Sequence, residues 1–258
     1  MSAHVLDVFM LFGDSITQGA WEPGRNGFGQ RLSHVYARKL DVLNRGLSGY
    51  NTIWSIPCLE QCLAKSADKS APKLRVLTIW FGANDACIKP SPQHVPLLTF
   101  VSNLERMVEM VKSPTSPHYS PETHIILISP PPVNTFQRRA DLESRNPPLK
   151  LDREFETTRS YAQAVRDVAS EKGVAFVDVW NLLWEASDRN EQELSRFLSD
   201  GLHLNAEGYR IMYEDLVSTI AREHPEVHYD NIGYVFPAWA EIDWANPDKS
   251  LYVTKRDE

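Results

Sequence analysis

The chain has 258 residues, of which 42% are hydrophobic and 24% are charged, and its formal net charge is −7. This composition excludes a disordered or fibrous protein, and the length suits one sizeable domain. The negative charge argues against a nucleic-acid binder, which needs clustered Lys and Arg to neutralise phosphates. No apolar run approaches the roughly 20 residues of a membrane helix, and HVLDVFMLF lacks the basic start and the length of a secretory signal. We therefore predict a single cytoplasmic domain over residues 1–258, with no membrane span and no nucleic-acid partner.

Short runs rich in β-branched and large apolar residues alternate with longer segments of helical period. The predicted strands lie at 5–12, 41–45, 74–81, 124–129 and 174–179, and the predicted helices at 27–39, 53–65, 96–112, 151–172 and 206–223. The strands are apolar throughout, which is typical of strands buried on both faces. This alternation predicts an α/β protein with three α/β/α layers, a central, mostly parallel five-stranded sheet and right-handed crossovers.

Two segments lack a clean period. Residues 130–150 begin with three consecutive prolines, which forbid a helix there, and continue with the basic piece QRRADLESR, whose acids interrupt its charge. We interpret that piece as solvated surface and the whole segment as a rim or lid beside a site. The aromatic-rich tail at 225–258 is expected to pack over the domain or against a second copy in a homodimer.

The sequence gives no support for a metal or a cofactor. Cys58, Cys62 and Cys87 are too few for a disulfide framework and are expected to be reduced. Cys58 and Cys62 could share a helix face, but zinc would need further ligands, and none is suitably spaced nearby. His224 and His228 flank a proline and lack the zincin order, so we interpret them as a helix end. The chain also lacks the G-x-G-x-x-G and P-loop patterns of nucleotide binders.

Suggestive polar groups follow several of the predicted strands. In open α/β sheets, ligands bind beyond the carboxyl ends of the strands. Asp200 and His203 are spaced so that one turn lets the carboxylate fix the imidazole tautomer, which leaves Nε2 to take a proton from the Ser15 hydroxyl. The Ser15 N–H, the Gly49 backbone and the Asn84 amide are suited to an oxyanion hole. These residues predict nucleophilic acyl transfer.

The blocks FGDSIT, NRGLSGYNT, FGAND and DGLHLN together resemble the GDSL esterase/lipase family, the SGNH hydrolases. They occur in the family's order, and their wording is most similar to that of the isoamyl acetate-hydrolysing esterases. The resemblance implies a flavodoxin-like α/β/α fold and metal-independent ester hydrolysis by Ser15, His203 and Asp200. Ile16 replaces the leucine of the GDSL name, a conservative apolar change.

Several residues in these blocks also have a simpler, structural interpretation. Ser15 alone would more often cap a helix than attack a carbonyl. Asp14 could brace the turn rather than serve as the triad acid, and Asp85 could cap a helix rather than bind a cation. Gly46 could replace Gly49 in the oxyanion hole, although the resemblance favours Gly49.

The expected function is hydrolysis of a small-molecule ester, with a short-chain acetate such as isoamyl acetate as the suggested substrate. The same groups could instead deacetylate a carbohydrate or transfer the acyl group to another alcohol, and the fold could also belong to a non-catalytic binding module. A compact apolar pocket would favour short acyl chains. Its expected walls are Trp54, Ile56, Val133 and Phe136.

Overall fold

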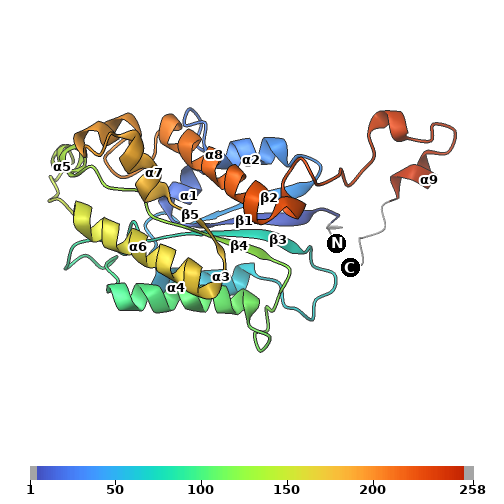
Figure 1. The fold of residues 1–258 in the computed structure, drawn as a ribbon, viewed down its shortest axis with the longest axis horizontal. Coiled ribbons are helices and arrows are strands. Elements are labelled where there is room, and N and C mark those ends of the chain that lie inside the picture. The colour runs from blue at the N-terminus through green and yellow to red at the C-terminus, as the bar shows by residue number, and fades with distance from the viewer. Residues whose placement is uncertain (1–4, 253–258) are drawn as a thin grey trace.

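A five-stranded sheet forms the centre of the computed structural model, which describes residues 5–252 (Figure 1). The strands are β1 (Asp7–Gly13), β2 (Leu40–Gly46), β3 (Leu74–Trp80), β4 (His124–Ile128) and β5 (Ala175–Val177). Their order is β2-β1-β3-β4-β5, and all four neighbouring pairs are parallel. The predicted five-stranded α/β architecture is thus confirmed.

Helices cover both faces of the sheet, as Figure 1 shows. One face carries α1 (Ser15–Gln18), α2 (Phe28–Val35), α7 (Val179–Ala186) and α8 (Ala206–Glu223). The other carries α3 (Thr52–Cys62), α4 (Leu97–Lys112) and α6 (Phe155–Lys172). The remaining elements are α5 (Thr135–Glu143), α9 (Pro247–Leu251) and the 3-10 turns η1 (Gly19–Trp21), η2 (Gln192–Arg196), η3 (Pro225–Val227) and η4 (Trp239–Glu241).

The two faces of β1 explain why the sheet needs helices on both sides. Successive side chains of a strand point to opposite faces. Phe9 and Leu11 therefore join the core beneath α2 and α8, whereas Met10 and Phe12 join the core beneath α3, α4 and α6. All four are at most 5% exposed, so the continuous apolar run in the sequence reflects burial on both faces.

Helix boundaries differ from expectation where polar groups cap or interrupt the chain. The helix predicted from 151 begins at Phe155 because Arg153 pairs as an isolated bridge with Cys87. Neither α5 nor α7 was predicted. Each begins where a polar side chain accepts a hydrogen bond from the first turn, Asn134 for α5 and Asp178 for α7.

The segment 137–145 is not solvated surface throughout, so that interpretation was wrong for Arg138. This residue lies on α5 and is only 5% exposed. Its charge is matched by the carboxylates of Asp141 on the same helix and of Asp152 and Asp200 from elsewhere in the chain, which offsets the cost of burying it.

The tail first follows the domain and then leaves it. Tyr36 donates a hydrogen bond to the Val227 carbonyl, and the Val235 amide donates to the Arg38 carbonyl. Beyond this, η4 and α9 stand apart from the sheet (Figure 1), with Trp239 and Trp244 stacked and mostly exposed. Contact of this tail with a second copy stays a prediction. Within residues 5–252, no helix is both long and apolar enough to cross a membrane.

Candidate active site

Ser15 is the first residue of α1, directly beyond the carboxyl end of β1. The cap of this helix is Asp14 and not Ser15, because Asp14 Oδ1 accepts the hydrogen bond of the Ile16 amide at 2.9 Å. Asp14 thus braces the turn, as the sequence suggested. It is only 1% exposed, and this burial raises the pKa of its carboxyl group to about 7. The Ser15 hydroxyl is left free of a capping role.

His203 and Asp200 lie on the loop that precedes α8. Asp200 Oδ1 accepts from the amides of Leu202 and His203, at 3.0 and 2.8 Å, and Oδ2 lies 2.8 Å from His203 Nδ1. Burial alone would raise the pKa of Asp200, but the hydrogen bonds and the charge of His203 outweigh it and hold that pKa far below its ordinary value. The carboxylate is therefore ionised.

The hydroxyl of Ser15 completes this arrangement, since its Oγ lies 2.9 Å from His203 Nε2. An ionised carboxylate can only accept, so Nδ1 carries the ring hydrogen and Nε2 is the acceptor for the serine proton. The structure thus brings the three predicted residues together in the order Ser15, His203, Asp200. Such an arrangement can activate a hydroxyl for attack on a carbonyl carbon.

Asn84 follows β3 and has a fixed amide orientation. Its Oδ1 accepts from Arg153 Nη2 at 2.8 Å, and its Nδ2 donates to the Tyr50 carbonyl at 2.9 Å. An amide nitrogen has two hydrogens, so the second can serve a substrate oxygen.

Positions 46 and 49 require glycine for different structural reasons. A Cβ on Gly46 would lie 2.0 Å from the backbone nitrogen of Gln18, so this glycine lets β2 pass close to α1. Gly49 has a φ of +80°, which disfavours other residues, while only Gln93 lies within 4 Å of its missing Cβ. Close approach of two segments thus requires glycine at position 46, whereas the backbone conformation favours glycine at position 49.

Asp85 neither caps its own segment nor faces solvent. Its Oδ1 accepts from the amide and hydroxyl of Thr52 at 2.9 and 2.6 Å, which ties the loop after β3 to the first turn of α3. Burial raises the pKa of Asp85 to about 6. The carboxylate thus holds together the two loops that carry Gly49 and Asn84.

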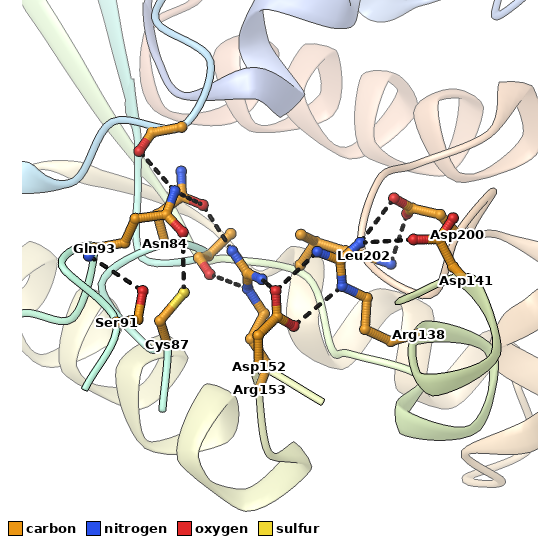
Figure 2. A network of polar contacts seen from close by, with 12 residues as sticks. Asn84, Cys87, Ser91, Gln93, Arg138, Asp141, Asp152, Arg153, Asp200 and Leu202 are labelled. Carbon is orange, nitrogen blue, oxygen red and sulfur yellow. Dashed lines mark hydrogen bonds and ion pairs between the residues drawn. The ribbon is translucent and has the colours of Figure 1, made fainter. Parts of the chain in front are cut away.

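Three charged residues that the sequence did not single out connect to this site. Figure 2 shows Arg138, Asp152 and Arg153 as a continuous set of polar contacts between Asp200 and Asn84. Arg138 and Arg153 are 5% and 2% exposed. Their sequence context offers no signal that separates them from surface charges.

The hollow beside Ser15 is polar rather than apolar. A cavity of about 490 Å³ is lined by Ser15, Gln18, Gly19, Trp21, Glu22, Arg25, Ser48 and His203. The expected apolar walls are not part of it. Ile56 and Val133 are 4% and 0% exposed and belong to the packed interior, whereas Trp54 and Phe136 are 40% and 56% exposed.

Groups able to hold a metal gather elsewhere. Among residues 5–252, one cluster of this kind is present, formed by His124, His224 and Glu226, whose ligand atoms lie within 4.8 Å of one another. His124 begins β4, so the cluster lies at the opposite end of the sheet from Ser15. His224 caps the C-terminal end of α8, in keeping with the expected helix end.

Comparison with known proteins relates the whole chain to esterases. Residues 11–211 match the model of the GDSL-like Lipase/Acylhydrolase family. The Isoamyl acetate-hydrolyzing esterase 1 homolog of Bos taurus is 36% identical over 244 residues, covering 94% of this chain and 90% of that protein. The Isoamyl acetate-hydrolyzing esterase of Saccharomyces cerevisiae is 33% identical over 241 residues, covering 91% and 94%.

Solved structures share the fold at lower identity. A lipase/acylhydrolase from Enterococcus faecalis superposes with a TM-score of 0.60 at 22% identity, covering 89% of this chain and 98% of that one. A catalytic mutant of an acetylxylan esterase from Geobacillus stearothermophilus gives 0.59 at 19% identity, covering 84% and 95%.

The family match and the curated relatives define a carboxylic ester hydrolase. More particularly, the chain belongs to the GDSL-like lipase/acylhydrolase family, as the order of its four sequence blocks indicated.

Proposed function

We propose that the protein hydrolyses short-chain carboxylic esters, with acetates such as isoamyl acetate as substrates, through Ser15, His203 and Asp200. The observation that carries the proposal is the pair of short contacts at His203, 2.9 Å to Ser15 Oγ and 2.8 Å to Asp200 Oδ2. The isoamyl acetate-hydrolysing relatives support the choice of substrate.

In this mechanism Ser15 Oγ attacks the ester carbonyl while His203 Nε2 takes its proton. Asp200 keeps the imidazole in the required tautomer and stabilises the imidazolium. The oxyanion is held by the N–H groups of Ser15 and Gly49 and by the Asn84 amide. His203 then protonates the leaving alcohol, and a water molecule, activated by the same imidazole, hydrolyses the acyl-enzyme.

Replacement of Ser15 by alanine tests the proposal. Ser15→Ala should lower kcat on isoamyl acetate by about 10⁴-fold or more, and Asn84→Ala by about 10²–10³-fold. Ser48→Ala is a matched control, because Ser48 lines the same cavity outside the triad. Esterase activity retained in Ser15→Ala would refute the mechanism.

Deacetylation of a carbohydrate is a second candidate, favoured by the polar cavity. Gln18, Glu22 and Arg25 offer hydrogen bonds to hydroxyl groups, and Trp21 offers a ring face for a sugar. Comparing kcat/KM for isoamyl acetate and an acetylated xylo-oligosaccharide decides between the two substrates. Product analysis with a competing alcohol separates hydrolysis from acyl transfer.

A further inference from the structure

The set of charges in Figure 2 spans the gap between two parts of the proposed site that come from different elements. Asp200 lies on the loop before α8, and Asn84 lies on the loop after β3. Between them, Arg138 donates to Asp200 Oδ2 at 3.1 Å and forms a two-pronged contact with Asp152, at 3.1 and 2.9 Å. Arg153 donates to the same Asp152 at 2.5 Å and to Asn84 Oδ1 at 2.8 Å.

Arg153 is one of three groups that orient the Asn84 amide, beside the Tyr50 carbonyl, which accepts from Nδ2, and Gln93 Nε2, which donates to Oδ1 at 3.4 Å. A guanidinium has only donors, so the Asn84 atom facing it must be the oxygen. The nitrogen then faces the Tyr50 carbonyl, and its second hydrogen is the one that the proposed mechanism uses for the oxyanion. Arg153 is itself fixed, because its Nε donates to the Ala83 carbonyl at 2.7 Å. Without Arg153, a flipped amide would present an acceptor to the oxyanion instead of a donor.

Arg138 helps to orient the carboxylate of Asp200, as Arg153 helps to orient the amide of Asn84. The carboxylate of Asp200 has four contacts, two backbone amides at Oδ1 and His203 with Arg138 at Oδ2. Arg138 therefore adds a second donor at Oδ2, the oxygen that contacts the His203 ring, and restrains the carboxylate further. A second hydrogen bond joins the elements themselves, since the Asn134 amide at the start of α5 donates to the Gly201 carbonyl at 2.9 Å.

Asp152 connects the two arginines, and its negative charge offsets the cost of burying their positive charges. Burial alone would raise the pKa of Asp152, but the hydrogen bonds and charges of Arg138 and Arg153 outweigh it and lower that pKa. The backbone of Asp152 is held as well, because its carbonyl accepts from the Ile88 amide at 2.8 Å. Asp152 thus holds both guanidinium groups against one fixed carboxylate.

We propose that Arg138, Asp152 and Arg153 are positioning residues that hold the triad acid and the oxyanion amide in a fixed relation to each other. This inference rests on the proposed function, since it assigns the three residues a part in the same acyl transfer. They act on kcat through Asp200 and Asn84.

The test uses Arg153→Lys and Arg138→Lys, which keep the charge but lose the planar fork. Arg153→Lys should lower kcat on isoamyl acetate about 10-fold or more and leave KM within about twofold, because an oxyanion donor is worth about 10²–10³-fold. The same change made in Asn84→Ala should cost nothing further. Arg138→Lys should likewise lower kcat in the wild-type background and have no further effect in Asp200→Asn.

Arg145→Lys is the matched control, because Arg145 also pairs with Asp141 near α5 but contacts neither Asp152 nor Asp200. Asp152→Asn, which keeps the size of the side chain, is a second variant should either lysine variant fold poorly, and it should lower kcat with KM unchanged. A merely structural role would instead lower the melting temperature and reduce kcat equally in the wild-type and Asn84→Ala backgrounds. That outcome would overturn the inference, as would an equal loss in Arg145→Lys. Esterase activity retained in Ser15→Ala would instead overturn the proposed function, so the two failures can be distinguished.

A different observation supports a metal site at the amino ends of the strands. His224 Nε2 is buried and has no hydrogen-bond partner among the described residues, while His124 Nε2 lies 3.0 Å from Glu226 Oε1. The His124 and His224 rings lie 4.3 Å apart between their centroids, and imidazole nitrogens are common metal ligands. Two imidazoles and one carboxylate suit Zn²⁺, which takes nitrogen and oxygen ligands at about 2.0–2.2 Å.

We infer that His124, His224 and Glu226 bind one divalent transition-metal ion apart from the esterase site. Titration of the full chain with Zn²⁺ should show one bound ion and a melting temperature that rises with metal concentration. His224→Gln should abolish both effects, whereas His34→Gln, an exposed histidine on α2, should retain them. Equal binding by His224→Gln, or no binding by the wild-type chain, would overturn this inference.

Discussion

Burial of Asp14 should make the stability of this protein fall as pH rises. The carboxyl group has a pKa of about 7 in the folded chain against an ordinary 3.8, so between these values it is neutral when folded and ionised when unfolded. The stability gained from the bound proton is complete below 3.8 and is lost as pH rises through the folded pKa. Each unit of pKa is worth about 1.4 kcal/mol, which makes the full difference about 4 kcal/mol.

Asp14→Asn removes this titration while keeping the Oδ1 acceptor that caps the Ile16 amide. The free energy of unfolding of the variant, relative to wild type, should therefore grow by about 3 kcal/mol between about pH 5 and about pH 8. Any constant difference from the new amide group cancels in this comparison.

Urea unfolding followed by circular dichroism at the two pH values measures the difference. Asp188→Asn, at a side chain that is 84% exposed, corrects for the change in net charge. A stability difference that stays constant with pH, or one that shrinks as pH rises, would show that Asp14 is ionised in the folded protein at pH 5.

Three further predictions concern packing around the site. Gly46→Ala should destabilise the fold by at least about 1–3 kcal/mol, because the added Cβ would lie 2.0 Å from the Gln18 nitrogen; an unchanged melting temperature would contradict this. Tyr209→Phe should cost about 1–2 kcal/mol in urea unfolding, since the buried hydroxyl donates to the Ile16 carbonyl at 2.6 Å. Leu216→Ala, at a fully buried position on α8, should cost about 2–5 kcal/mol, and a loss below that range would mean that the cavity collapses.

The residues that follow the strands could be predicted because strand position alone places them. Continuous apolar runs indicate buried parallel strands, and the carboxyl ends of such strands share one edge of the sheet. Ser15 and Asn84 could therefore be expected near each other despite their distance in sequence. Asp200 and His203 could be predicted as a pair because their spacing lets one turn bring the two side chains together.

The arginines could not be predicted because nothing local distinguishes them from surface charges. Arg138 meets Asp200 62 positions away, and Arg153 meets Asn84 69 positions away. Acids beside Arg138 in sequence suggested solvation, and only the packing of α5 against the loop before α8 buries it. The pocket walls were misjudged for a related reason: Ile56 lies on the face of α3 that packs against the sheet.

The contact between Ser15 and His203 joins residues 188 positions apart, which has a consequence for how the protein matures. Contacts this distant close a large loop, and the conformational entropy lost in closing it is offset only by the contacts that form when α8 docks on the sheet. A chain with its sheet formed and α8 still detached carries the serine without its base. On the proposed mechanism, a chain in that state is inert toward esters, so hydrolysis returns only once α8 has docked.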